Sequence, residues 1–159
     1  MRPKQRINPL VHIPPPLVFV LSFLAGVGLE HWMPLRFWPD GLIGAARLAG
    51  FVLAIGGLGL MFACIVLFRF SRTTVIPHRH AKALVEHGPY RFSRNPMYLG
   101  LVLAYLGACG IFTLLWPLIL MPVPLWFLNR VMIPFEEARL RHIFDDRYDA
   151  YCERVRRWF

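Results

Sequence analysis

Two short clusters of charged residues flank a long uncharged stretch of the chain, and the residue types in the first suit anion binding. This cluster contains Arg91, Arg94, Asn95 and Pro96. Asn is a preferred N-cap residue and Pro is favoured at the first helical position, so Asn95 and Pro96 predict a helix start. The positive end of that helix, with two guanidinium groups beside it, could bind a carboxylate or a phosphate. Arginines that only contact lipid headgroups are the alternative interpretation.

The second cluster is acidic and consists of Glu136 and Glu137, two residues after Pro134. Pro134 can begin a helix, and the helix dipole stabilises acids in the first turn. Glu137 could also pair with Arg141, four residues further on. Capping and pairing would therefore explain both acids structurally. Adjacent acids at a membrane surface are nevertheless costly unless they are solvated or partnered, which makes them a candidate site.

The segment between the clusters must position them. Residues 95–129 contain no Asp, Glu, Lys or Arg. A single helix of that length would measure about 52 Å, whereas the hydrocarbon core of a bilayer is roughly 30 Å thick. We therefore expect a hairpin of two short helices that turns between Cys109 and Pro117. Such a hairpin brings Arg94 and Glu136 to the same end of neighbouring helices.

The composition predicts an all-α integral membrane protein. Hydrophobic residues make up 57% of the chain, charged residues 17%, and the mean hydropathy is +0.48. Soluble domains average about 25% charged residues, so a water-soluble globule and a disordered chain are both excluded. We expect one domain, residues 1–159, with four spans at about 10–29, 48–68, 96–112 and 114–133, a cytoplasmic connection at 69–95, and an amphipathic cytoplasmic helix at 134–157.

The formal net charge of +9 reflects where the basic residues lie. Nearly all of them precede the first span, follow the second or follow the fourth; Arg36 and Arg47 are the exceptions. The positive-inside rule then places both termini in the cytoplasm. This distribution accounts for the charge without nucleic acid as a partner. His78 and His80 have no further ligand at a suitable spacing, so no metal is expected.

Two patterns concern helix packing. Small residues recur at helical spacing along the second span, at Ala46, Gly50, Ala54 and Gly57. Such a stripe lets two helices approach closely, and it leaves an oligomer possible. Three prolines in the fourth span predict kinks or local unwinding, at Pro117, Pro122 and Pro124. Broken backbone at membrane depth must face protein or a cavity rather than lipid.

The sequence around both clusters resembles the bacterial form of a family of membrane methyltransferases. This family includes the isoprenylcysteine carboxyl methyltransferases and the phospholipid methyltransferases. The resemblance rests on Leu84-Val85, Gly88-Pro89-Tyr90-Arg91 and Arg94-Asn95-Pro96-Met97-Tyr98-Leu99-Gly100. It continues in Pro134, Glu136-Glu137, Leu140, Phe144, Tyr148, Tyr151 and Arg154-Val155-Arg156-Arg157-Trp158. Prenylcysteine enzymes usually carry His where this chain has Lys82 and Asn95, so the acceptor stays open.

The resemblance implies a bacterial inner-membrane enzyme that uses S-adenosyl-L-methionine and takes a lipophilic substrate from the bilayer. It implies Arg94 and Glu137 as catalytic residues. The implied cofactor-binding residues are Tyr90, Asn95, Pro96, Tyr98, Gly100, Glu136 and Glu137. The acceptor would be the carboxylate of an isoprenylcysteine-like molecule or another small amphiphile, or alternatively a phospholipid amine.

Two other function classes stay open. Membrane NADPH-dependent sterol or enone reductases share a similar Arg-x-Pro-x-Tyr-x-Gly stretch, but they typically have Asn and an acid where this chain has Met97 and Leu101. A non-enzymatic membrane scaffold would explain the hydrophobicity. It would not explain why an arginine-bearing helix start and a paired-acid helix start occur together.

Overall fold

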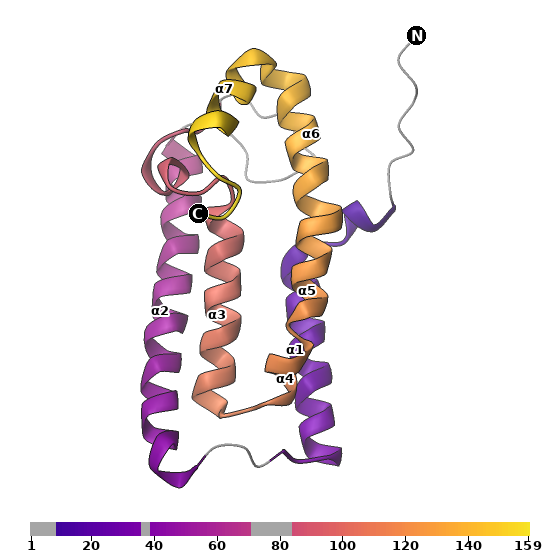
Figure 1. Ribbon diagram of the computed structural model, residues 1–159, viewed down its shortest axis with the longest axis vertical. Helices are drawn as coiled ribbons and strands as arrows, with labels where there is room; N and C mark the ends of the chain where they lie inside the picture. The colour runs from indigo at the N-terminus through magenta and orange to yellow at the C-terminus, as the bar shows by residue number, and fades with distance from the viewer. Residues whose placement is uncertain (1–8, 36–38, 71–83) are drawn as a thin grey trace.

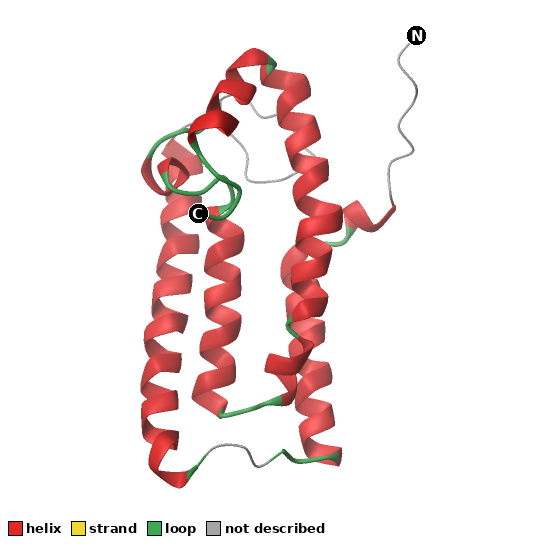
Figure 2. Cartoon of the chain, viewed as in Figure 1, coloured by secondary structure: helices red, strands yellow, loops and turns green. Residues whose placement is uncertain are grey.

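Helices make up nearly all of the regular structure in a computed structural model of the protein, which describes residues 9–35, 39–70 and 84–159 (Figures 1 and 2). The α-helices are α1 (Pro15–Trp32), α2 (Asp40–Phe70), α3 (Pro96–Phe112), α4 (Trp116–Leu120), α5 (Pro122–Phe127), α6 (Ile133–Phe144) and α7 (Asp146–Arg154). Two 3₁₀ turns, Pro9–His12 and Gly88–Arg91, and a π-helical turn, Leu128–Met132, complete the described elements.

Among the residues that the structure describes, three helical segments are long and apolar enough to cross a membrane. They are α1, α2 and the run Trp116–Phe144, which joins α4, α5, the π-helical turn and α6. The shorter apolar helix α3 begins and ends where the third span was expected. The predicted all-α integral membrane fold is confirmed. Helix α1 begins later than residue 10 because consecutive prolines lack the N–H groups that a helix interior needs, so Pro15 lies at its start.

Helices α2 and α3 form a closely packed antiparallel pair (Figure 1). A Cβ atom added at Gly57 would lie 2.5 Å from the Gly100 carbonyl oxygen, and one added at Gly107 would lie 2.5 Å from the Ala54 nitrogen. The small residues of α2 thus face small residues of α3. This contact lies within the chain, so the stripe that left an oligomer possible is already covered by α3.

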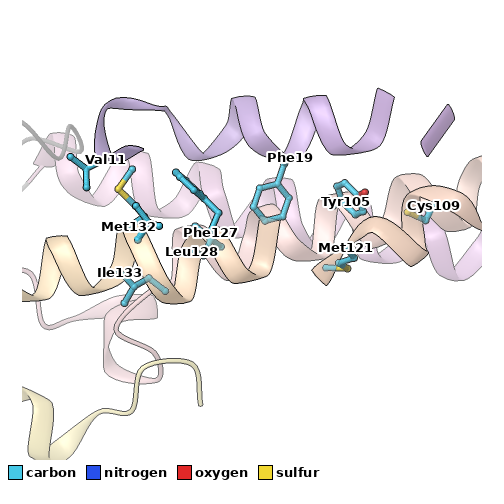
Figure 3. Close-up of a cluster of buried hydrophobic side chains, with 10 residues drawn as sticks. Val11, Phe19, Tyr105, Cys109, Met121, Phe127, Leu128, Met132 and Ile133 are labelled. Carbon is cyan, nitrogen blue, oxygen red and sulfur yellow. The ribbon is translucent and has the colours of Figure 1, made fainter. Parts of the chain in front are cut away.

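Helix α1 packs against the fourth helical segment. A Cβ atom at Gly26 would lie 2.5 Å from the Pro117 nitrogen, which shows how closely the two backbones approach. A buried cluster joins α1, α3 and the fourth segment (Figure 3), formed by Val11, Phe19, Tyr105, Cys109, Met121, Phe127, Leu128, Val131, Met132 and Ile133. Dispersion and apolar burial in this cluster hold the two helix pairs together.

The fourth segment is irregular, as its prolines predict. The Met121 N–H donates to the Leu118 carbonyl, which closes a tighter turn before Pro122. The Pro117 carbonyl accepts a hydrogen bond of 2.7 Å from the buried Tyr105 hydroxyl. Pro117 and Pro124 are buried against protein, whereas Pro122 is exposed. In the π-helical turn, the Ile133 N–H donates to the carbonyl of Leu128, five residues back.

The expected single helix at 134–157 is wrong. Helix α6 continues the fourth segment to Phe144, and the chain then reverses at Asp145, whose φ of 44° interrupts the helix. Helix α7 folds back, and its Tyr148 and Tyr151 are buried in a cluster with Leu84. The apolar face of this segment therefore finds a protein partner rather than a lipid surface.

Candidate active site

The start of α3 carries the first predicted cluster. Pro96 is the first helical residue and Asn95 precedes it, as predicted. The Asn95 side chain does not cap the helix, which corrects that expectation. Its Nδ2 group instead donates to the Arg157 carbonyl over 3.0 Å, and its backbone N–H donates to the Ser93 hydroxyl over 3.1 Å. Asn95 is buried and fastens the chain terminus to the start of α3.

Residues 155–159, here called the C-terminal segment, bridge α3 and the fourth segment. The Arg94 N–H donates to the Arg156 carbonyl over 3.0 Å, and the Ser93 hydroxyl donates to the Arg157 carbonyl over 3.2 Å. On the other side, Trp158 Nε1 donates to Asn129 Oδ1 over 3.0 Å. The C-terminus accordingly lies at the end of the bundle where α3 begins (Figure 1).

The Glu137 carboxylate is the centre of the charged cluster. Arg157 binds it with two hydrogen bonds, Nε to Oε1 over 3.0 Å and Nη2 to Oε2 over 2.7 Å. Nη2 of Arg94 lies 3.4 Å from Oε1. The side chains of Arg94 and Glu137 are only 15% and 14% exposed. Among the described residues, the buried Arg94 Nε has no hydrogen-bond partner.

This arrangement corrects two expectations. Glu137 does not pair with Arg141, which instead contacts Asp149 at the exposed surface over 2.6 Å. Arg157 belongs to the stretch that was expected to form an amphipathic cytoplasmic helix, but its guanidinium turns inward to Glu137. The hydrogen bonds to Glu137 raise the pKa of Arg157 further, so its guanidinium remains charged beside this carboxylate.

Glu136 completes the acidic pair from the adjacent position of α6. Its Oε1 accepts a hydrogen bond of 2.5 Å from the Tyr98 hydroxyl, which projects from the first turn of α3. Together with the Arg94–Glu137 contact, this bond confirms that the two clusters predicted from sequence meet at one end of the bundle. A short hydrogen bond to a carboxylate also fixes the orientation of the Glu136 side chain.

Tyr90 and Gly100 lie differently from the other predicted site residues. Tyr90 belongs to the 3₁₀ turn before α3, where its carbonyl accepts a 2.7 Å hydrogen bond from the Tyr151 hydroxyl. Burial raises the pKa of the Tyr90 hydroxyl, which stays protonated. Gly100 faces α2, because a Cβ atom there would lie 2.6 Å from the Gly57 carbonyl oxygen. Its place in the motif has a packing explanation.

The structure therefore brings together Arg94, Asn95, Pro96, Tyr98, Glu136 and Glu137, keeps Tyr90 beside them, and turns Gly100 away. Within the described ranges, no group of three His, Cys, Asp or Glu side chains could hold a metal ion. His78, His80 and Lys82 lie outside the described residues.

Sequence reasoning missed three residues around this site: Ser93, Asn129 and the inward-facing role of Arg157. A signal existed for Asn129, which is the last residue of the uncharged stretch and a polar amide in an apolar helix. No local pattern indicates that Arg157 meets Glu137, because the pairing depends on how the chain reverses at Asp145.

Known proteins resemble this chain over part of its length. A family model described as phospholipid methyltransferase matches residues 45–147. Two rice proteins, from the indica and japonica subspecies, are described as probable protein-S-isoprenylcysteine O-methyltransferases. Each is 29% identical to this chain over 86 residues, which cover 54% of this chain and 45% of the rice protein. The chain thus spans about half the length of these curated relatives. No solved structure matches it.

Proposed function

This chain belongs to the phospholipid methyltransferase family, and from that premise we propose that it transfers a methyl group from S-adenosyl-L-methionine to a lipophilic acceptor at the cytoplasmic membrane face. The observation that supports this proposal most strongly is the buried cluster of Arg94 and Glu137 at the start of α3. The family match and the apolar helices show an integral membrane protein; a bacterial inner membrane and cytoplasmic termini are part of the proposal.

The residues of the cluster fit this cofactor. The Arg94 Nε group is a buried N–H donor without an acceptor. Burying such a donor costs free energy unless a ligand supplies the acceptor. The carboxylate of the methionine moiety would supply that acceptor, with the Asn95 and Pro96 helix start beside it. Glu136 and Glu137 can hold ribose hydroxyls or the ammonium group. Tyr98, whose hydroxyl donates to Glu136, and Tyr90, in the turn before α3, would complete the walls.

S-adenosyl-L-methionine would supply an electrophilic methyl carbon. The acceptor lone pair would attack this carbon in line, and the carbon–sulfur electron pair would leave with the sulfur. The protein then contributes positioning and electrostatics. Arg94 provides a planar donor fork that can orient a carboxylate or phosphate. The Tyr98 hydroxyl holds Glu136 in one orientation. The C-terminal segment is hydrogen-bonded to Ser93 and Arg94, just before α3, and would limit the access of water to the cluster.

Two acceptor chemistries remain within this proposal. The first is an anionic acceptor, such as the carboxylate of an isoprenylcysteine-like amphiphile, which needs no general base because it is already deprotonated. The family description favours a phospholipid amine. An amine must lose a proton, and Glu136, Glu137 or His87 would be the available bases.

Calorimetric binding of S-adenosylhomocysteine to the detergent-purified protein tests the cofactor, with NADPH titrated in parallel. We expect micromolar binding of S-adenosylhomocysteine and at least a tenfold loss in Arg94→Ala and in Glu137→Gln. Glu86→Gln is the matched control, because Glu86 forms its ion pairs with Arg147 and Arg154 outside the cluster. Binding of NADPH alone would favour the reductase, and binding of neither by folded protein would favour the scaffold.

A further inference from the structure

Asn129 is a polar amide within the apolar fourth segment, and both of its polar atoms are used. Its Nδ2 group donates to the Leu125 carbonyl over 2.9 Å. Its Oδ1 atom accepts the hydrogen bond from Trp158 Nε1 over 3.0 Å. The bond to Leu125 fixes which way the amide faces, so the acceptor is presented to the indole. Asn129 lies in the π-helical turn Leu128–Met132, and such turns often mark functional positions.

Trp158 attaches the C-terminal segment to the fourth helical segment. Its ring packs against the buried cluster that includes Met132 and Ile133, while its N–H reaches Asn129. The preceding residue, Arg157, holds the Glu137 carboxylate with two hydrogen bonds. Consecutive residues of the C-terminal segment therefore attach to one helical run at two places, and Asn129 is the place furthest from the charged cluster.

The same segment is tied to α3 by backbone groups. The Arg156 carbonyl accepts from the Arg94 N–H, and the Arg157 carbonyl accepts from Ser93 and Asn95. Releasing Trp158 would leave this segment attached to the fourth helical segment only through the Arg157 and Glu137 side chains. The Arg157 guanidinium would then lose its fixed approach to Glu137, and the carboxylate would lose one of the two cations that orient it.

We propose that Trp158 and Asn129 form a positioning pair, which holds the C-terminal segment so that Arg157 keeps Glu137 and Arg94 in the arrangement that binds the cofactor. This inference rests on the proposed function, because the arrangement matters only if the cluster binds S-adenosyl-L-methionine. Neither residue of the pair touches the cofactor; both act through Arg157 and Glu137.

The test compares Trp158→Phe, which removes the N–H but keeps an aromatic ring, with Asn129→Leu and the double variant. Calorimetry measures the dissociation constant for S-adenosylhomocysteine, and thermal unfolding is measured beside it. One hydrogen bond corresponds to about a three- to tenfold change in an equilibrium constant. We expect each single variant to weaken binding by that factor, the double variant to weaken it no further, and the unfolding temperature to change little. Trp126→Phe is the matched control, because Trp126 is 59% exposed on α5.

Amide hydrogen exchange on the ligand-free protein gives a second readout. In Trp158→Phe the Arg94 amide, which donates to the Arg156 carbonyl, should exchange faster than in the wild type or in Trp126→Phe. If the wild type binds S-adenosylhomocysteine and the variants bind it with the same affinity, the positioning role of Trp158 and Asn129 is refuted, whereas the proposed function is not. Effects that multiply in the double variant, or unchanged exchange at Arg94, would overturn the positioning role as well. A wild-type protein that binds no S-adenosylhomocysteine would overturn the proposed function and the pair together.

Discussion

The substitution Gly57→Ala should destabilise the protein by separating α2 from α3. The added Cβ atom would lie 2.5 Å from the Gly100 carbonyl oxygen and 2.6 Å from the Ala104 nitrogen. Ordinary carbon contacts are about 3.5 Å or longer, so one backbone must move by roughly 1 Å. Overpacking of this kind costs about 1–3 kcal/mol, and backbone obstacles favour the upper end. The higher helix propensity of alanine offsets about 1 kcal/mol of this cost, so the free energy of unfolding should fall by about 2 kcal/mol.

Gly56→Ala is the matched control, because nothing lies within 4 Å of a Cβ atom at Gly56. There the helix propensity acts alone and should stabilise α2 by up to about 1 kcal/mol. Circular dichroism at 222 nm, recorded during heating in detergent, should show a lower unfolding temperature for Gly57→Ala, by roughly 4–8 °C, and an equal or higher one for Gly56→Ala. Equal unfolding temperatures in the two variants would refute the close α2–α3 contact.

Three further predictions concern single hydrogen bonds and ion pairs. Tyr98→Phe should lower the affinity for S-adenosylhomocysteine about three- to tenfold in calorimetry, since Glu136 loses its hydroxyl donor; unchanged affinity would exclude Glu136 from the site. Tyr105→Phe should reduce the free energy of unfolding by about 0.5–1.5 kcal/mol in detergent denaturation, because the Pro117 carbonyl loses its donor, and no loss would argue against that bond. Glu86→Gln should reduce the free energy of unfolding by less than about 1 kcal/mol in the same measurement, because its partners Arg147 and Arg154 are about two-thirds exposed. A larger loss would show that the packing of α7 depends on this contact.

The sequence by itself determined the class of the protein, its long apolar helices and the end of the bundle where the two charged clusters meet. A long uncharged run that crosses lipid forms a helix, because there each backbone N–H and C=O group finds its hydrogen-bond partner within the same segment. The Asn95 and Pro96 helix start follows from local backbone preferences. A hairpin short enough to cross the bilayer then forces Arg94 and Glu136 toward one end.

Only the tertiary structure decided which charged groups pair. Glu137 has Arg141 one helical turn away, yet it binds Arg157 and Arg94, while Arg141 contacts Asp149. Helical spacing describes neighbours along one element, whereas the choice between partners depends on where a distant segment returns. The reversal at Asp145 returns residues 155–159 across the start of α3, and there Asn95 donates to a carbonyl of the chain terminus instead of capping its helix. Burial makes these long-range partners necessary, because a buried carboxylate without a cation is far more costly than an exposed one.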